Sequence, residues 1–350
     1  MRLLSKPSTA RCSVPIYVLY LLSEPQWVSC VRLAEILEDV SHDSINRFLL
    51  RESYTPNDLY VQLKEHITLI GGTLSVDDTV VDKPYRDPKL TELVDWFWSG
   101  KHKRPVKGLN IITLYYTDIH GCSVPVNYRV VNKAEGRTKN EYFREMLEDV
   151  LSWGLRPAVI TGDSWYASGD NLKLIKHKQL GVIMGIECNR LVSVEKGTWR
   201  HVESLEIPAD GLMVDLEGLG RVKVFRTVFK HEFRYYLLHW PTAQQMAESD
   251  RRQFKQIHDC HWGIECFHRA IKQVCNVERF HVRDTQAILN HIFCSFWGFI
   301  QLELQRFRGE IINWYQPRRE LFNEVLRDCI LNTPIEHIDI PKQYAQSVNA

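Results

Sequence analysis

The sequence has no C-x-x-C pair, although it contains nine cysteines among its 350 residues. An odd number of cysteines without paired spacing argues against a disulfide framework and against a zinc ribbon. Such thiols are typical of a reducing compartment. Cys260, Cys266 and Cys275 lie near His258 and His261 in the sequence, but ligand pairs at zinc-finger spacing are missing, so a zinc site is the less favoured interpretation of this region.

The chain also lacks a long apolar run and an excess of charge of one sign. Its two apolar stretches, residues 14–22 and 292–300, are shorter than the roughly 18 residues that span a bilayer, so we expect no membrane segment and a cytoplasmic protein. The formal net charge is +1, which gives no global attraction to a polyanion. Nucleic-acid binding would therefore depend on local basic clusters, such as residues 101–107, 251–255 and 318–319.

What the chain does contain is enough apolar material for two or three domains. Hydrophobic residues make up 44% and charged residues 25% of the sequence, as in an ordinary globular protein. Changes in hydrophobic periodicity divide the chain into five parts. We predict a helical DNA-binding region, the first part of an α/β core, a β-rich insertion, the last helices of the core and a helical tail, at residues 1–68, 69–190, 191–245, 246–310 and 311–350.

Residues 29–52 have the pattern of a helix-turn-helix. Apolar residues recur at spacings of three and four on both sides of the turn at residues 39–41, and Ser41 is suited to cap the second helix. Asparagine and arginine suit bidentate contact with adenine and guanine edges. The alternative is a helical hairpin that packs on a larger domain. On the first interpretation, the second helix presents to DNA the residues His42, Asp43, Ser44, Asn46 and Arg47.

From Gly72 onward the pattern changes to short strands mixed with amphipathic helices, which predicts a mixed sheet covered by helices. The predicted strands are 73–77, 109–117, 124–131, 158–162 and 181–186, and the helices are 139–153 and 170–179. Asp77 falls on the first strand and Asp163 at the carboxyl end of the fourth. If these two strands are neighbours in the sheet, the two carboxylates meet.

A third carboxylate, Glu265, lies in a helical pattern, with Lys272 two turns later. Three carboxylates from distant parts of a chain can hold two divalent ions about 4 Å apart, an arrangement that promotes phosphoryl transfer. Mg²⁺ and Mn²⁺ prefer such oxygen ligands. Asp78 competes with Asp77 for the first position, but we favour Asp77, since Asp78 would point to the opposite face of the strand.

Three short motifs carry a resemblance to a known family. They are Asp77-Asp78-Thr79 after a strand, Asp163-Ser164-Trp165-Tyr166 after a strand, and the helical residues Trp262, Ile264, Glu265, Phe267 and Lys272. Together they resemble a DDE transposase of a bacterial insertion sequence, in the IS4-like and IS701-like group, over about residues 70–300. The intervals are 163 − 77 = 86 and 265 − 163 = 102 positions, and the long second interval is similar to members with a β-rich insertion.

The resemblance implies an RNase H-like mixed sheet flanked by helices, with the β-rich insertion and an N-terminal all-helical region. It implies that Asp77, Asp163 and Glu265 are catalytic and bind two Mg²⁺ (or Mn²⁺) ions, which cut transposon ends and transfer the 3′-hydroxyl into target DNA. The implied partners are double-stranded DNA, as terminal inverted repeats and target, and a second copy of the chain, near the bacterial nucleoid. The alternatives are a nuclease of the same fold without strand transfer and a domesticated relic that only binds DNA.

The sequence departs from the group's signature Y-(2)-R-(3)-E-(6)-K, because His258 and His261 stand at the tyrosine and arginine positions. In the group these positions touch DNA phosphates, and neutral imidazoles would make a weaker or pH-dependent clamp. We expect Arg251 and Arg252 to replace the missing guanidinium. Trp165 either covers the sheet end or stacks on a base. The candidate DNA contacts are therefore Lys272, Arg269, His258, His261, Arg251, Arg252, Asn46, Arg47 and Trp165.

Overall fold

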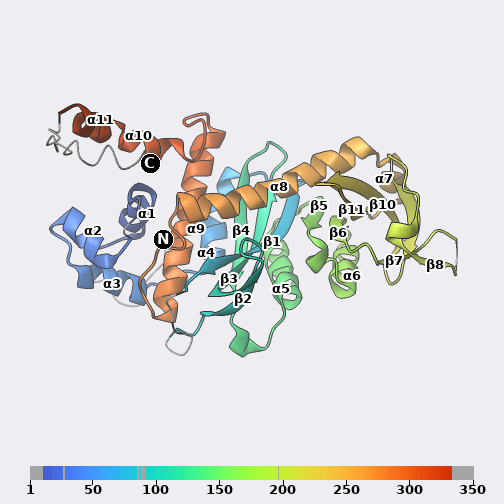
Figure 1. The fold of residues 1–350 in the computed structure, drawn as a ribbon, viewed down its shortest axis with the longest axis horizontal. Coiled ribbons are helices and arrows are strands. Elements are labelled where there is room, and N and C mark those ends of the chain that lie inside the picture. The colour runs from blue at the N-terminus through green and yellow to red at the C-terminus, as the bar shows by residue number, and fades with distance from the viewer. Residues whose placement is uncertain (1–10, 27, 85–86, 88–90, 196, 333–350) are drawn as a thin grey trace, which may run out of the picture.

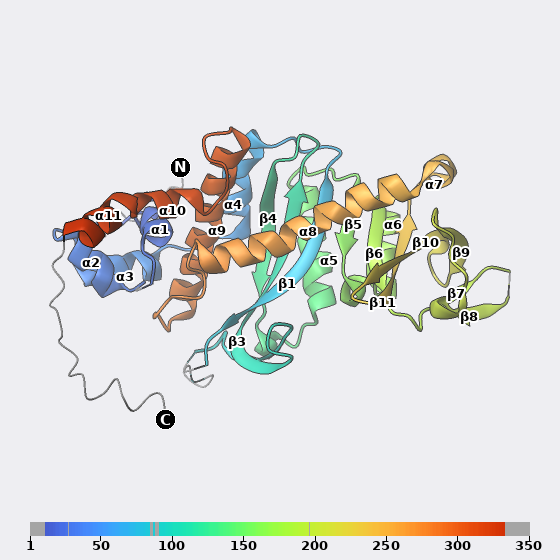
Figure 2. The ribbon, with the colours of Figure 1, turned by 45° about the horizontal axis from the view of Figure 1, so that its top comes forward.

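The computed structural model describes residues 11–332 except 27, 85, 86, 88–90 and 196. An eleven-stranded sheet forms the middle of the molecule. Helices of the two chain ends gather near one end of it, and the strands of the β-rich insertion form its opposite end (Figures 1 and 2). The last part of the predicted helical tail, residues 333–350, lies outside the described residues.

The core of the sheet has the strand order β4-β3-β1-β5-β6. Its strands are β1 (Thr73–Asp82), β3 (Arg104–Thr117), β4 (Ser123–Val130), β5 (Val159–Gly162) and β6 (Gly181–Ile186). β1 pairs antiparallel with β3 and parallel with β5, and β5 pairs parallel with β6. The predicted RNase H-like mixed fold is confirmed. β2 (Asp95–Ser99) was not predicted, so Asp163 follows the fifth strand rather than the fourth.

Both faces of this sheet are covered, which explains why its central strands are apolar on both sides. α5 (Lys139–Ser152) and α6 (Gly169–His177) pack on one face. α8 (Arg251–Gln273) crosses the other face (Figure 2). α5 begins with a capping box between Thr138 and Glu141, a local signal that fixes the start of a helix.

The insertion is β-rich, as predicted, but it continues the core sheet. Its strands are β7 (Leu191–Ser193), β8 (Trp199–His201), β9 (Leu212–Leu216), β10 (Gly220–Phe229) and β11 (Glu232–His239), followed by α7 (Ala243–Glu248). β11 pairs antiparallel with β6, and β10, β9, β7 and β8 follow in that order. The insertion therefore extends the edge of the core sheet directly.

The N-terminal part is helical, with α1 (Val14–Ser23), α2 (Cys30–Leu37), α3 (His42–Arg51) and α4 (Pro56–Leu63). The predicted pair of short helices is confirmed, and the Ser41 side chain caps α3 by accepting from the amide of Ser44. The expectation that Ser44 faces outward was wrong. Its side chain is buried and accepts a 2.7 Å hydrogen bond from the amide of Arg11, because α3 turns this side toward the packed helices.

α9 (Thr285–Phe307) is long and apolar enough to cross a membrane by length and composition, contrary to our expectation from the sequence. However, 83% of its apolar window is buried inside the protein. The Asn290 side chain donates to the carbonyls of Leu49 and Glu52, which fastens α3 to α9. α9 is therefore placed as the central helix around which the N-terminal helices pack.

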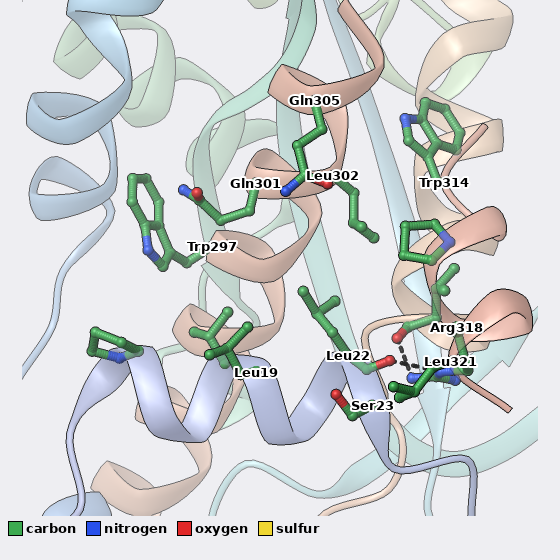
Figure 3. A pocket seen from close by; sticks show the side chains of 14 residues that line it. Leu19, Leu22, Ser23, Trp297, Gln301, Leu302, Gln305, Trp314, Arg318 and Leu321 are labelled. Carbon is green, nitrogen blue, oxygen red and sulfur yellow. Dashed lines mark hydrogen bonds between the residues drawn. The ribbon is translucent and has the colours of Figure 1, made fainter. Parts of the chain in front are cut away.

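An apolar pocket of about 480 Å³ lies where α1, α9 and α10 (Gln316–Leu321) meet (Figure 3). The Arg318 guanidinium borders it and donates to the carbonyls of Leu21 and Leu22 at the end of α1. The described residues that line it include no carboxylate and no histidine. This pocket offers packing surface rather than catalytic groups. α11 (Asn323–Asn332) completes the described chain.

Candidate active site

The hydroxyl oxygens of Ser75 on β1 and Thr161 on β5 lie 2.8 Å apart, between register partners of two parallel strands. Nδ1 of His261 is 3.3 Å from the Thr161 hydroxyl, so this face of the sheet is the one that α8 covers. Asp77 and Asp163 each follow two residues later, and alternation directs both to the same face. Because neighbouring strands lie about 4.8 Å apart, the two carboxylates start from adjacent positions.

Asp78 occupies the opposite face, as expected from the alternation of β1. Its carboxylate accepts hydrogen bonds from Asn110 Nδ2 at 2.6 Å and Lys139 Nζ at 2.7 Å. The Tyr166 hydroxyl donates to it at 3.2 Å. These three donors come from β3, α5 and the segment after β5, so Asp78 ties the sheet to the helices behind it and is already well supplied with partners.

Asp163 lies immediately beyond β5. Its Oδ1 accepts from the amide of Trp165 at 3.0 Å and caps the short helix η3 (Ser164–Tyr166), which leaves Oδ2 for another partner. Desolvation, and then repulsion by Asp77 and Asp78, raise the pKa of Asp163 to about 6. The residue nevertheless keeps solvent contact. A cation between the carboxylates would relieve that repulsion.

α8 runs along β1 and carries the third carboxylate. The Lys272 ammonium donates to the carbonyl of Val80 at 2.6 Å. Glu265 is exposed, and within the described part of the chain no hydrogen bond or ion pair holds its carboxylate. Burial, and then the charge of Asp77, raise the pKa of Glu265. Glu265 and Asp77 are thus close enough to interact, and the Glu265 side chain is able to change rotamer.

His268 is a residue of this site that sequence reasoning missed. It is 7% exposed, and its Nδ1 lies 3.5 Å from Oδ2 of Asp77. Its Nε2 is buried without a hydrogen-bond partner in the described structure. Burial alone would raise the pKa of Asp77, but the contact and charge of His268, with His261, lower it. The signal was present, since a residue three positions after Glu265 on a helix shares its face.

The donor set fits divalent cations in its chemistry, because it consists of carboxylate oxygens at one end of a sheet. Asp77 and Asp163 come from adjacent backbone positions, and Glu265 projects from the helix above Asp77. Within the described ranges, however, no three acidic, histidine or cysteine side chains are gathered closely enough to hold an ion as they stand.

The two histidines at the signature positions are partly buried. His258 contacts the rings of Tyr236 and Phe254, with centroids 4.9 and 5.6 Å away. His261 contacts Thr161, as described above. Burial lowers the pKa of both imidazoles. They are therefore neutral at physiological pH and supply no positive charge to a bound phosphate.

The basic residues of α8 differ in how free they are. Arg251 donates to the carbonyl of Arg226 at 2.9 Å, so its guanidinium fastens the start of α8 to β10. Lys272 contacts Glu278 at 3.4 Å in addition to its bond with β1, so it is not simply solvated. Arg252 and Arg269 are exposed. The predicted DNA contacts of these residues remain predictions, and Arg251 would first have to leave its present partner.

Trp165 is 62% exposed beside Asp163, whereas Tyr166 is fully buried. Tyr166 therefore covers the sheet end, and Trp165 keeps a free ring face, with the Lys139 ammonium 5.7 Å from its centroid. Asn46 and Arg47 are exposed on α3, which lies at the end of the molecule away from β7–β11 (Figure 1). They do not belong to the carboxylate site.

An RNase H-like sheet with acidic residues on β1, after β5 and on a late helix defines a polynucleotide-cutting or polynucleotide-joining catalytic core. The family model of the transposase DDE domain matches residues 71–297. The chain belongs to this family and is a DNA transposase, and enzymes of this class depend on divalent metal. The matched range begins just before β1 and ends within α9, and it includes all three carboxylates.

Among solved structures, the chain is similar to the piggyBac transposase in its synaptic complex with hairpin DNA. The TM-score is 0.54 at 13% identity, covering 96% of this chain and 74% of that one. This likeness supports the fold alone. The Drosophila P element transposase strand transfer complex matches with a TM-score of 0.20 at 10% identity, covering 93% and 74% of the two chains, which is too low to support an argument. No curated protein matches the chain.

Proposed function

We propose that Asp77, Asp163 and Glu265 hold two divalent cations, Mg²⁺ or Mn²⁺, and that this site cuts transposon ends and joins the freed 3′-hydroxyl to target DNA. The observation that carries the proposal is the register of β1 and β5. The Ser75–Thr161 contact orients the two strands so that the aspartates after it share one face and one end of the sheet.

Bound cations would lower the pKa of the attacking water or hydroxyl and stabilise charge on the scissile phosphate. Each residue of the chain has a separate part. Asp77 offers carboxylate oxygens from a rigid strand and is held by His268. Asp163 keeps one oxygen on the amide of Trp165 and offers the other. Glu265 completes the set from α8, where its exposed side chain can move to meet the ions.

The DNA partners that we propose are the terminal inverted repeats and the target duplex. Trp165 and Arg269, close to the carboxylates in sequence, are exposed and available to DNA, and so is Arg252 at the start of α8. Asn46 and Arg47 on the helix-turn-helix would contact the repeats at a separate place. We further propose a homodimer that pairs two ends near the bacterial nucleoid. Light scattering of the protein with and without end DNA tests this, and a monomer in both conditions would contradict it.

The decisive experiment is Mg²⁺- or Mn²⁺-dependent cleavage of DNA that carries the element's ends. We expect Asp77→Ala, Asp163→Ala and Glu265→Ala to abolish cleavage while DNA binding, measured by gel shift, is retained. Asp259→Ala is the matched control, because Asp259 is an exposed carboxylate on the same helix. Cleavage that survives Asp77→Ala would overturn the assignment of the first ligand.

Two other activities give different outcomes in the same assays. A nuclease without strand transfer would cut ends but would not join pre-cleaved ends to a target duplex. A domesticated relic would bind DNA in a salt-sensitive manner and never cut it. Transfer of a labelled, pre-cleaved end into a plasmid by the intact protein, and its loss in Asp163→Ala, would exclude both.

A further inference from the structure

The hairpin of β10 and β11 brings one arginine to the carboxylate end of the sheet, by which we mean the end where Asp163 follows β5. Tyr236 on β11 is the register partner of Gly185 on β6. At Gly185 the backbone of Ser164 comes so close that a Cβ would lie 3.1 Å from its amide nitrogen. The hairpin strand is therefore only one strand away from the segment that carries Asp163.

The side-chain direction of β11 follows from its contacts. The Tyr236 ring packs against Phe254 and His258 of α8, with centroids 5.5 and 4.9 Å away. Arg234 precedes Tyr236 by two residues, so alternation directs it to the same side. The register ends with Tyr235 opposite Ile186, so Arg234 lies just beyond the end of β6. It thus shares both the face and the end of the sheet with Asp77 and Asp163.

The Arg234 guanidinium is held but not neutralised. Its central carbon lies 4.1 Å from the ring centroid of Phe229, across the hairpin. Arg234 is exposed, and no carboxylate of the described structure forms an ion pair with it. The N–H groups of a guanidinium lie in its own plane, so stacking on an aromatic ring leaves them free at its edge. There they can bind two oxygens of a phosphate.

Electrostatic effects agree with this placement. Burial and Asp77 raise the pKa of Glu265, and His268, Arg269 and Arg234 oppose that rise. Arg234 therefore acts on the third carboxylate from a different element than α8. The signature positions of α8, His258 and His261, carry neutral imidazoles. The Arg234 guanidinium from β11 therefore supplies the positive charge that α8 lacks at these two positions.

The same hairpin carries a second arginine with similar chemistry on its other face. Arg226 is the register partner of Tyr235, which alternates with Arg234 and Tyr236, so it points away from α8. Its guanidinium carbon lies 4.5 Å from the ring centroid of Phe233. Arg226 is thus a matched control for Arg234, with the same charge and the same kind of stacking partner.

We propose that Arg234, stacked on Phe229, is a DNA-phosphate contact that holds the strand being cut against the carboxylates. The proposal rests on the proposed function only in taking the carboxylate end as the place of cleavage. A phosphate contact of this kind reads no sequence, so it serves both the transposon end and the flanking DNA.

The test is DNA binding by the full chain in EDTA, measured as fluorescence anisotropy of a labelled mixed-sequence duplex between about 50 and about 200 mM salt. We expect Arg234→Ala to weaken binding about tenfold at the lower salt, the size of one charge-assisted contact. It should also reduce the log–log salt slope by about one. Arg226→Ala should stay within about twofold of the parent protein, and Arg234→Lys should restore the slope with part of the affinity.

Equal binding by Arg234→Ala and Arg226→Ala, whether both are weakened or neither is, would overturn the proposal. Phe229→Ala is a second variant that keeps the charge but removes its support, and we expect it to weaken binding less than Arg234→Ala while thermal melting confirms folding. Because EDTA removes metal, this result is independent of the metal site. Failure of the parent protein to cut DNA would contradict the proposed function and leave the binding comparison valid.

Discussion

The hydroxyls of Ser75 and Thr161 lie 2.8 Å apart, and this contact fixes which face of the sheet Asp77 and Asp163 occupy. It joins register partners on two parallel strands, and a hydrogen bond between such partners requires both side chains to point to one side. Asp77 and Asp163 inherit that direction because they follow by two residues. The relation also explains why Asp78, only one residue away from Asp77, has an entirely different set of partners.

We expect Asp78→Ala to destabilise the protein and Asp77→Ala to leave it stable. Asp78 is 15% exposed and receives the Lys139 ammonium at 2.7 Å, so its removal leaves a half-buried cation and a tyrosine hydroxyl without their acceptor. The cost should be about 2–4 kcal/mol in free energy of unfolding, near the range for breaking a buried pair. Urea unfolding of both variants measures it, and equal stability would contradict the structural role of Asp78.

His268→Gln should lower metal-dependent cleavage about 10- to 100-fold, as is usual when a residue that orients a metal ligand is changed. His268 acts through Asp77, from which it is 3.5 Å away, and is too buried to contact DNA. Affinity for DNA in EDTA should therefore be unchanged. Calorimetric titration with Mn²⁺ should show the same weakened binding in Asp77→Ala and in the Asp77→Ala, His268→Gln double variant. Additive losses would show that His268 acts on something else.

Stability should decrease on mild acidification because of His291 in α9. Its Nδ1 accepts from the Tyr17 hydroxyl at 3.0 Å, and its Nε2 donates to the carbonyl of Asn276 at 3.1 Å, so both nitrogens are used by the neutral ring. Burial, and then the charge of Lys83, lower the pKa of His291 to about 3. Below the pKa of histidine in the unfolded chain, about 6.5, the unfolded chain binds a proton at His291, whereas the folded chain leaves this ring neutral.

Stability should therefore fall as pH decreases from about 6.5 toward 3, by about 2 kcal/mol between about pH 7 and about pH 5. Urea unfolding at the two pH values measures this slope. His291→Gln should be less stable at pH 7 but should lose most of the pH dependence. An unchanged slope in the variant would assign the effect to other groups.

Arg318→Ala should cost about 2–4 kcal/mol of stability, because Arg318 donates to four backbone carbonyls that end two helices. Its partners are the carbonyls of Leu21, Leu22, Gln273 and Val274. The neighbouring Arg319 is exposed, so Arg319→Ala should stay within about 0.5 kcal/mol. Thermal melting of the two variants provides the comparison, and similar melting temperatures would contradict the role of Arg318 as a clamp.

Much of the local structure was predictable from neighbouring residues alone. Ser41 marks the start of α3, and the Thr138–Glu141 box marks the start of α5, since caps depend on residues three positions apart. The alternation of β1 separates Asp77 from Asp78. The approximate bounds of β6 and α5, and the end of β5 just before Asp163, follow from periodicities that a short segment expresses by itself. The predicted end of the first strand at Asp77 was wrong, because β1 continues to Asp82 through its pairing with β3.

Contacts between distant segments were less accessible. Arg251 carries a charge that suggests DNA binding, but its guanidinium donates a hydrogen bond to the carbonyl of Arg226. Ser44 is polar, but its side chain is buried and accepts a hydrogen bond from the amide of Arg11. The apolar composition of α9 suits a membrane and a protein core equally, and only the helices packed around it distinguish the two. In each case the deciding partner lies far away along the chain.

The sequence by itself determined the residue types of the proposed site: one aspartate within a strand, one directly after a strand, a glutamate on a helix and a lysine two turns later. It did so because strands and helices have short, regular periods. Only the tertiary structure decided which groups surround them. The pairing of β11 with β6 brought Arg234 toward Glu265, and the crossing of α8 over β1 buried His268 against Asp77. Strand pairing and helix packing depend on the whole core, so no local pattern records them.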